Sequence, residues 1–365
     1  METGKMGDTG MLDVTEAVYP VLLAGGVGSR LWPLSRELSP KQIIKFLGKE
    51  SLLQSTIKRV TQVLNAENVR IVCGENHFDE TARQLQETGI SPADKIICEP
   101  CGRNTAPAIL LAVLNILKDE NDAILCVFPA DHVVGDASAF QHKLESAIQL
   151  AGEGFVVTFG IKPHYPETGY GYIEGEKELG GDARSIKRFV EKPDIKTARE
   201  YLKAGNFYWN SGMFAFRASV MVDQFKAFEP ELFSRMSHLV AAKETVAKAD
   251  YQKLPNISID YAIMEKTNKG AVLPSDFGWS DIGSWKSLYD FLPKDDNGNV
   301  IKGDVIANKT KNCLIIGSKR LVTANGVKNM VVVETSDSVF VSDIESTQDV
   351  KTIVTELKEK KRKEY

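Results

Sequence analysis

Short apolar runs alternate with helix-like stretches through the first 160 residues of the chain. Runs short enough to be single buried strands stand at 19–24, 69–73, 95–98 and 122–128. Helices are expected between and after them, at 51–64, 78–88, 105–118 and 136–151. This alternation predicts an α/β domain with a mainly parallel sheet covered by helices on both faces. Ligands of such sheets bind at the carboxyl ends of the strands.

The pattern changes after Pro293. Short β-prone runs separated by Gly and Asn turns follow, and apolar positions at 350, 353, 354 and 357 outline a final amphipathic helix. We therefore divide the chain into a flexible leader (1–17), a large α/β domain (18–292) and a β-rich domain that ends in a helix (293–365). The last region carries no recognisable chemistry and is expected to serve packing or subunit contact.

The first predicted strand runs directly into a glycine-rich loop. Gly25, Gly26 and Gly28 let backbone N–H groups approach a ligand closely, because no Cβ stands in the way. Arg30 adds a planar fork of donors suited to phosphate oxygens, and Lys41 supplies a second cation. The loop with its two cations predicts a polyphosphate site.

Two better-known phosphate motifs are not completed here. Neither Gly-Lys pair, at 4–5 or 48–49, is followed by the Ser or Thr of a P-loop. Leu31 stands where the dinucleotide fingerprint has its third glycine. The alternative to a phosphate site is an ordinary glycine turn at the end of a strand.

Two aspartates are candidates for holding a metal ion. Asp131 follows the strand at 122–128, so its carboxylate is expected at the sheet edge, where it could hold Mg²⁺ against a triphosphate. It could instead cap the next helix, although Asp136 suits that cap better. Asp281 lies in the segment FGWSDIGSW and could instead form an Asx turn. The sequence leaves open whether Asp131 and Asp281 meet.

Composition narrows the class of protein. The 365 residues are 43% hydrophobic and 26% charged, with a net charge of −4, so no basic excess points to nucleic acid. No apolar run reaches the ~18 residues that a membrane span needs. Five scattered cysteines indicate reduced thiols in a cytoplasm. Cys98 and Cys101 form a CxxC, but no second metal-ligand pair accompanies it.

Eight segments in order resemble one enzyme family. GGVGSRLWPLS with SPKQ resembles the opening of sugar-1-phosphate nucleotidylyltransferases, in the form typical of mannose-1-phosphate guanylyltransferases. The resemblance continues through EPCGRNTAPA, FPADH, ETGYGYIE, RFVEKP, WNSGMF, SIDYAIME and WSDIGSW. It implies a Rossmann-like nucleotidyltransferase domain, a small C-terminal β-helix-like domain and a homodimer.

The resemblance also implies a reaction and a set of site residues. GTP and mannose 1-phosphate would give GDP-mannose and pyrophosphate, with Mg²⁺ as cofactor. The implied catalytic residues are Arg30, Lys41, Asp131 and Asp281, the last two holding the metal. The implied nucleotide-binding residues are Leu23, Ala24, Gly25, Gly26, Gly28, Ser29, Arg30 and Asn104. The implied sugar-phosphate-binding residues are Gly169, Glu191, Lys192 and Asn210.

Two alternatives stay open. One is the same chemistry on another pair, UTP or dTTP with glucose 1-phosphate. The other is a non-catalytic regulatory subunit that binds a nucleotide sugar. Such a subunit is expected to have lost one of the four catalytic residues, and this chain keeps all four.

Overall fold

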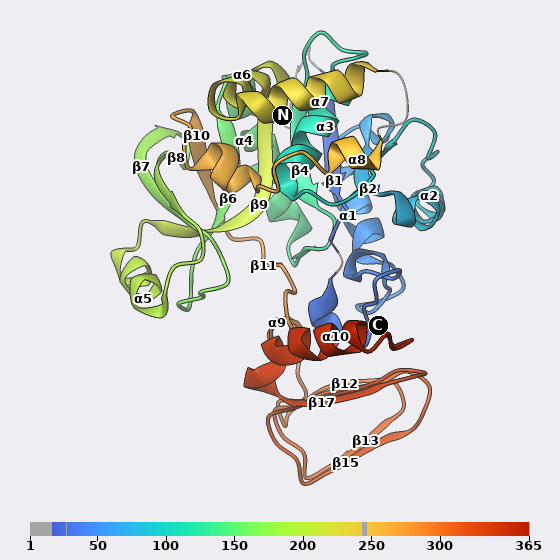
Figure 1. The fold of residues 1–365 in the computed structure, drawn as a ribbon. Helices are drawn as coiled ribbons and strands as arrows, with labels where there is room; N and C mark the ends of the chain where they lie inside the picture. Colours follow the sequence, from blue (N-terminus) through green and yellow to red (C-terminus); the bar gives the residue numbers. More distant parts are fainter. Residues whose placement is uncertain (1–16, 27, 243–246, 365) are drawn as a thin grey trace, which may run out of the picture.

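The computed structural model describes residues 17–364 except 27 and 243–246. The predicted leader therefore lies outside the described residues, apart from Ala17. Figure 1 shows a large α/β part and a smaller β part below it, joined through β11 and α9. No helix among the described residues is long and apolar enough to cross a membrane.

A nine-stranded sheet forms the centre of the large part, in the order β3-β2-β1-β4-β9-β6-β10-β8-β7. Its strands are β1 (Val18–Leu23), β2 (Arg70–Gly74), β3 (Ile96–Glu99), β4 (Ile124–Pro129), β6 (Val156–Ile161), β7 (Tyr172–Gly180), β8 (Ala183–Val190), β9 (Phe207–Arg217) and β10 (Gly270–Ser275). β8 and β9 run against the other seven, so the sheet is mixed. The five strands up to residue 161 all run in one direction, which confirms the parallel arrangement expected from that stretch.

The four helices expected in the first half are present. They are α1 (Leu52–Val60), α2 (Phe78–Glu87), α3 (Thr105–Ile116) and α4 (Ala137–Gly152). Asp136 caps α4 by accepting from the N–H of Ala139, as expected from its position. The later helices are α5 (Ile195–Ala204), α6 (Ala218–Phe228), α7 (Pro230–Ala241), α8 (Lys248–Tyr251) and α9 (Trp285–Phe291). The helix expected after Ser258 is a single π-helical turn, η5 (Asp260–Met264).

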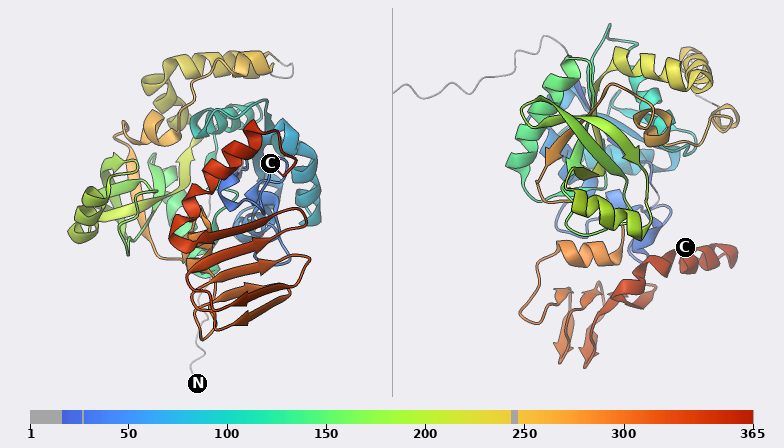
Figure 2. Two further views of the ribbon diagram at one scale, coloured as in Figure 1. Left: turned by 60° about the horizontal axis from the view of Figure 1, so that its bottom comes forward. Right: turned by 90° about the vertical axis from the view of Figure 1, so that its left-hand side faces the viewer.

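Each face of the sheet buries its own core. Alternate residues of β4 point to opposite faces: Phe128 packs with α1 and α4 on one face, and Val127 packs with α3, α6 and α7 on the other. Figure 2 shows helices on both sides of the sheet. The predicted two-faced cover is therefore confirmed.

The β part is a short stack of strands that pair in parallel, except that β17 (Val339–Asp343) runs antiparallel to β16 (Met330–Glu334). One sheet contains β12 (Val300–Lys302), β14 (Leu314–Gly317), β16 and β17. A second sheet pairs β13 (Val305–Asn308) with β15 (Val322–Asn325). Figure 2 shows α10 (Val350–Glu359) lying alongside the stack. The expected all-β structure with a final helix is confirmed.

The two parts share one hydrophobic core. Leu31, Trp32 and Trp285 from the large part pack in the same cluster as Phe340 and Val354 from the β part. The Trp32 ring meets the Phe340 ring edge-on, with centroids 6.1 Å apart. The segment that follows the glycine loop therefore rests on the C-terminal part of the chain.

Candidate active site

A two-stranded sheet joins the two candidate metal-binding segments. β5 (Val133–Val134) pairs antiparallel with β11 (Trp279–Ser280). Because Asp131 lies just before β5 and Asp281 just after β11, this pairing brings the two aspartates into one cavity. The structure thus answers the question that the sequence left open.

Lys41 is the polar centre of that cavity. Its Nζ lies 2.9 Å from Asp131 Oδ2 and donates to the backbone carbonyl of Asp281 at 2.6 Å. Its side chain is only 6% exposed. Burial alone would raise the pKa of Asp131, but the charge of Lys41 holds that pKa below its usual value. Asp131 is therefore an ionised carboxylate at neutral pH.

His132 lines the cavity next to Asp131. The indole Nε1 of Trp279 donates to His132 Nδ1 at 3.2 Å, so the ring proton lies on Nε2, 3.7 Å from Asp131 Oδ1. Burial lowers the pKa of His132, which is therefore neutral at pH 7. His132 is a supporting group next to Asp131.

The carboxylate of Asp281 is held from two directions. Its Oδ1 accepts from the hydroxyl of Tyr170 at 2.8 Å and from the N–H of Gly283 at 2.9 Å. The second bond is the Asx turn weighed above for this residue, and it leaves the carboxylate inside the cavity. The local turn and the candidate metal site are therefore compatible.

The cavity has a volume of about 210 Å³ and is lined by Gly28, Arg30, Lys41, Asp131 and Asp281 among others. No group of three or more His, Cys, Asp or Glu in the described chain is arranged to hold a metal by itself. Mg²⁺ commonly takes one or two protein carboxylates and completes its shell with water and phosphate oxygens. Two aspartates beside a phosphate loop fit that donor set.

The glycine loop is braced by the segment that carries Lys41. Gln42 is buried, and its amide donates to the carbonyls of Ala24 at 2.7 Å and Gly26 at 2.9 Å. Gly28 has φ +62°, and a Cβ there would lie 2.7 Å from the Cβ of Lys41. The loop and the η2 turn (Lys41–Ile43) therefore form one packed unit.

A second cavity of about 310 Å³ adjoins the first, and Asp131 lines both. Leu23, Gly25, Gly26 and Asn104 from the predicted nucleotide-binding set line it. The side chain of Asn104 also caps α3, and the backbone of this residue has φ +69°. Ala24, which belongs to the same predicted set, is buried beside this cavity and accepts the Gln42 bond. The backbone of Ser29 begins the short helix η1 (Ser29–Leu31).

Glu99 lines the second cavity, and the sequence reasoning missed it. It is 5% exposed, and the hydroxyl of Tyr251 donates to its Oε1 at 2.7 Å. Burial raises the pKa of Glu99 to about 7, and the Tyr251 bond opposes that rise. A buried acid in a cleft is a signal of function that only the folded chain reveals.

Two of the four predicted sugar-phosphate residues, Glu191 and Asn210, lie near each other beside the second cavity. Asn210 donates to Asp260 Oδ1 at 3.0 Å, and its N–H donates to the carbonyl of Gly171 at 2.8 Å. A Cβ on Gly171 would lie 2.6 Å from Glu191 Oε2. Burial, and next the charge of Glu191, raises the pKa of Asp260 to about 6. Gly171 and Asp260 are thus additional members of this group.

The other two predicted sugar-phosphate residues have different surroundings. β8 ends at Val190, and Lys192 forms an ion pair with Glu191 while its side chain remains 55% exposed. Gly169 is exposed, and its N–H donates to Glu167 Oε1 at 2.7 Å.

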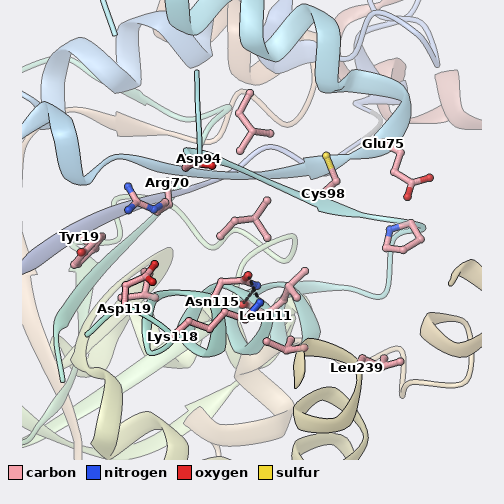
Figure 3. A pocket seen from close by; sticks show the side chains of 15 residues that line it. Tyr19, Arg70, Glu75, Asp94, Cys98, Leu111, Asn115, Lys118, Asp119 and Leu239 are labelled. Atoms are coloured by element: carbon pink, nitrogen blue, oxygen red, sulfur yellow. Dashed lines mark hydrogen bonds between the residues drawn. The ribbon is translucent and has the colours of Figure 1, made fainter. Parts of the chain in front are cut away.

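A larger cavity lies away from these residues. Figure 3 shows this space of about 700 Å³, with Tyr19, Arg70, Asp94 and Cys98 among the lining side chains. It is formed around the outer strand β3 and the helices α3 and α7. None of the predicted site residues lines it.

Comparison with known proteins identifies the family of each part of the chain. A model of the nucleotidyl transferase family matches residues 19–298. A model of the mannose-phosphate isomerase/GMP-like β-helix domain matches residues 303–357, which confirms the expected β-helix.

Named relatives share most of the chain. The mannose-1-phosphate guanylyltransferase RfbM of Salmonella typhimurium is 45% identical, over 95% of this chain and 74% of its own length. A mannose-1-phosphate guanylyltransferase of Klebsiella pneumoniae is 42% identical, over 95% of this chain and 75% of its own.

Among solved structures, a Thermus thermophilus protein described as a mannose-1-phosphate geranyltransferase is 35% identical, with a TM-score of 0.85 over 93% of this chain and 99% of its own. A UDP-glucose pyrophosphorylase complexed with UDP-glucose, 15% identical, has a TM-score of 0.50 over 75% of this chain and 97% of its own, and shares the fold alone. The resemblance drawn from the sequence motifs is confirmed. The chain belongs to the nucleotidyl transferase family, in the branch whose relatives are named mannose-1-phosphate guanylyltransferases.

Proposed function

We propose that this chain transfers GMP from GTP to α-D-mannose 1-phosphate, giving GDP-mannose and pyrophosphate. The observation that carries the proposal is Lys41, which contacts Asp131 and the backbone of Asp281 directly beside the glycine loop. Relatives that match 95% of the chain are named for this activity.

The reaction needs no nucleophile from the protein. A phosphate oxygen of mannose 1-phosphate attacks the α-phosphorus of GTP, and the bond from that phosphorus to the bridging oxygen of the β-phosphate breaks. Pyrophosphate leaves with the electron pair of that bond. Catalysis then depends on alignment and on stabilising negative charge.

The cations beside the loop would supply that stabilisation. Arg30 and the loop amides would hold the β- and γ-phosphates, while Lys192 would meet the sugar phosphate. Lys41 would lower the local negative charge, because two anionic groups 4 Å apart repel by about 4 kcal/mol at an effective dielectric near 20. Glu191 and Asn210 would position the sugar hydroxyls.

Asp131 and Asp281 would hold Mg²⁺. When bound, the ion draws charge from the phosphate oxygens that it contacts. Lys41 keeps Asp131 ionised, and Tyr170 with Gly283 keeps the Asp281 carboxylate directed into the cavity.

The test is pyrophosphate release with mannose 1-phosphate, comparing GTP with UTP, dTTP and ATP, in Mg²⁺ and in EDTA. We expect release with GTP that EDTA abolishes. We also expect Arg30→Ala to lower turnover about a hundredfold without unfolding the protein, since a loop cation supports little of the core. Release mainly with UTP or dTTP would keep the reaction type but show that GTP is not the nucleotide substrate. A folded protein that released none would favour the regulatory subunit.

Two further properties are proposals for this chain. A reducing cytoplasm suits its five free cysteines. A homodimer would give a partner to Val339 and Val341, which are more than half exposed on β17. Light scattering of the purified protein would measure its mass in solution and decide the second proposal.

A further inference from the structure

Lys351 lies in the first turn of α10, which packs against η1 at the end of the glycine loop. Val350 and Val354 of this helix share a core with Leu31 and Trp32. The indole Nε1 of Trp32 also donates to the carbonyl of Glu364 at 2.8 Å. In Figure 1, α10 (red) lies next to the blue segment that follows β1. The C-terminal helix is therefore fixed beside the phosphate loop.

At this contact between α10 and η1, two other cations from distant parts of the sequence act on Lys351. The positive charge of Arg30, then burial, then the charge of Lys192 lower the pKa of Lys351. Each of the three comes from a different element: Arg30 from η1, Lys192 from the loop after β8, and Lys351 from α10.

Of these three cations, only Lys192 has an ion-pair partner among the described residues. Lys192 forms an ion pair with Glu191. Within the described part of the chain, the side chains of Arg30 and Lys351 make no ion pair or hydrogen bond. Like charges held close together repel one another, even where water screens them. Two cations that the fold brings together, each without an ion pair of its own among the described residues, favour an anionic ligand.

We propose that Lys351 is a third phosphate-binding cation of the active site, and that it binds the β- and γ-phosphates of GTP and the pyrophosphate formed from them. The proposal rests on the proposed function, and it adds a residue of the C-terminal domain to the site. Arg30 lines the metal cavity and follows the phosphate loop directly. Arg30 acts on Lys351 more strongly than Lys192 does, and it lies on η1, against which α10 packs, so we assign Lys351 to the pyrophosphate end rather than to the sugar end.

No sequence motif indicates this role. Lys351 is one of many lysines in the last part of the chain, and its neighbours in sequence carry no phosphate-binding pattern. Its role follows from the packing of α10 onto Leu31 and Trp32, which depends on the complete fold.

The experiment compares Lys351→Ala with Lys351→Arg and with Lys328→Ala, a control on an exposed lysine in the turn between β15 and β16. We measure KM for GTP and mannose 1-phosphate in the forward direction and KM for pyrophosphate with GDP-mannose in reverse. Lys351→Ala should raise KM for GTP and for pyrophosphate about tenfold, the loss expected for one partly solvated charged contact. KM for mannose 1-phosphate should change less than about twofold. Lys351→Arg should restore most of the loss, and Lys328→Ala should match the wild type.

An unchanged KM for pyrophosphate in Lys351→Ala would overturn the proposal, and so would an increase confined to mannose 1-phosphate. Calorimetric titration of inorganic pyrophosphate into the resting protein separates this outcome from a failure of the proposed function. Weaker binding in Lys351→Ala supports the proposal even if the wild type uses another substrate pair. If Lys351→Ala and the wild type bind pyrophosphate equally and the wild type is active with GTP and mannose 1-phosphate, the role of Lys351 is rejected and the proposed function stands.

Discussion

Two buried acids next to the site, Glu99 and Asp260, have raised pKa values because the fold removes them from water. Each has a polar partner that the sequence does not reveal, since Tyr251 lies 152 residues from Glu99 and Asn210 lies 50 residues from Asp260. At high pH each acid must ionise in its buried position, and that ionisation costs folding free energy.

Glu99 should make the stability of the protein fall as pH rises. Its pKa is about 7 in the folded state against an ordinary value of 4.5, so the folded protein binds this proton more tightly than the unfolded chain. Stability is therefore lost between about pH 4.5 and pH 7, by up to about 3 kcal/mol. Glu99→Gln should reduce this loss, measured by urea unfolding at pH 5 and pH 8. Equal pH dependence in variant and wild type would show that Glu99 is not the source.

At this scale the sequence predicted residues that lie close to strand ends. Gly25 and Asp131 could be singled out because a strand end and a distinctive residue coincide, and Arg30 because it closes the glycine loop. The bracing bonds of Gln42 and the role proposed for Lys351 could not be predicted, because both depend on partners brought in by folding.

Among the elements, the glycine loop and the η2 turn depend on each other. Gly28→Ala would place a Cβ 2.9 Å from the backbone N of Lys41 at φ +62°, where a non-glycine residue costs about 1–3 kcal/mol. We expect lower stability by that amount and a loss of turnover of at least about tenfold, because Lys41 must move. The matched control is Gly26→Ala, whose Cβ would meet nothing within 4 Å. If both variants behave alike in thermal unfolding, the contact with Lys41 is not what requires glycine.

Some elements could not be predicted from the sequence, because they are too short or depend on long-range pairing. Short apolar runs identified β1, β2 and β4, and helical spacing of apolar residues identified the helices between them. The β5–β11 pair consists of two residues on each side, too few to produce a pattern, yet it brings Asp131 and Asp281 together. The place of β9 between β4 and β6 depends on long-range pairing, which local periodicity does not encode.

Across the whole molecule, the shared core should make the β part necessary for the site. Phe340→Ala removes a ring that is 4% exposed and packs against Trp32, so we expect a loss of about 3–5 kcal/mol and lower activity. Leu321→Ala, in the same part of the chain and 52% exposed, is the control and should be near neutral. Thermal unfolding followed by the activity assay at 25 °C measures both effects. Full activity in a destabilised Phe340→Ala would show that the site does not depend on this contact.

The shared core also sets the order in which the molecule can be completed during synthesis. Leu31 leaves the ribosome 323 residues before Val354, which packs in the same cluster. At roughly 5–20 residues per second, the glycine loop waits on the order of 15–65 s for its final support. The glycine loop is thus made well before the segment that completes its environment.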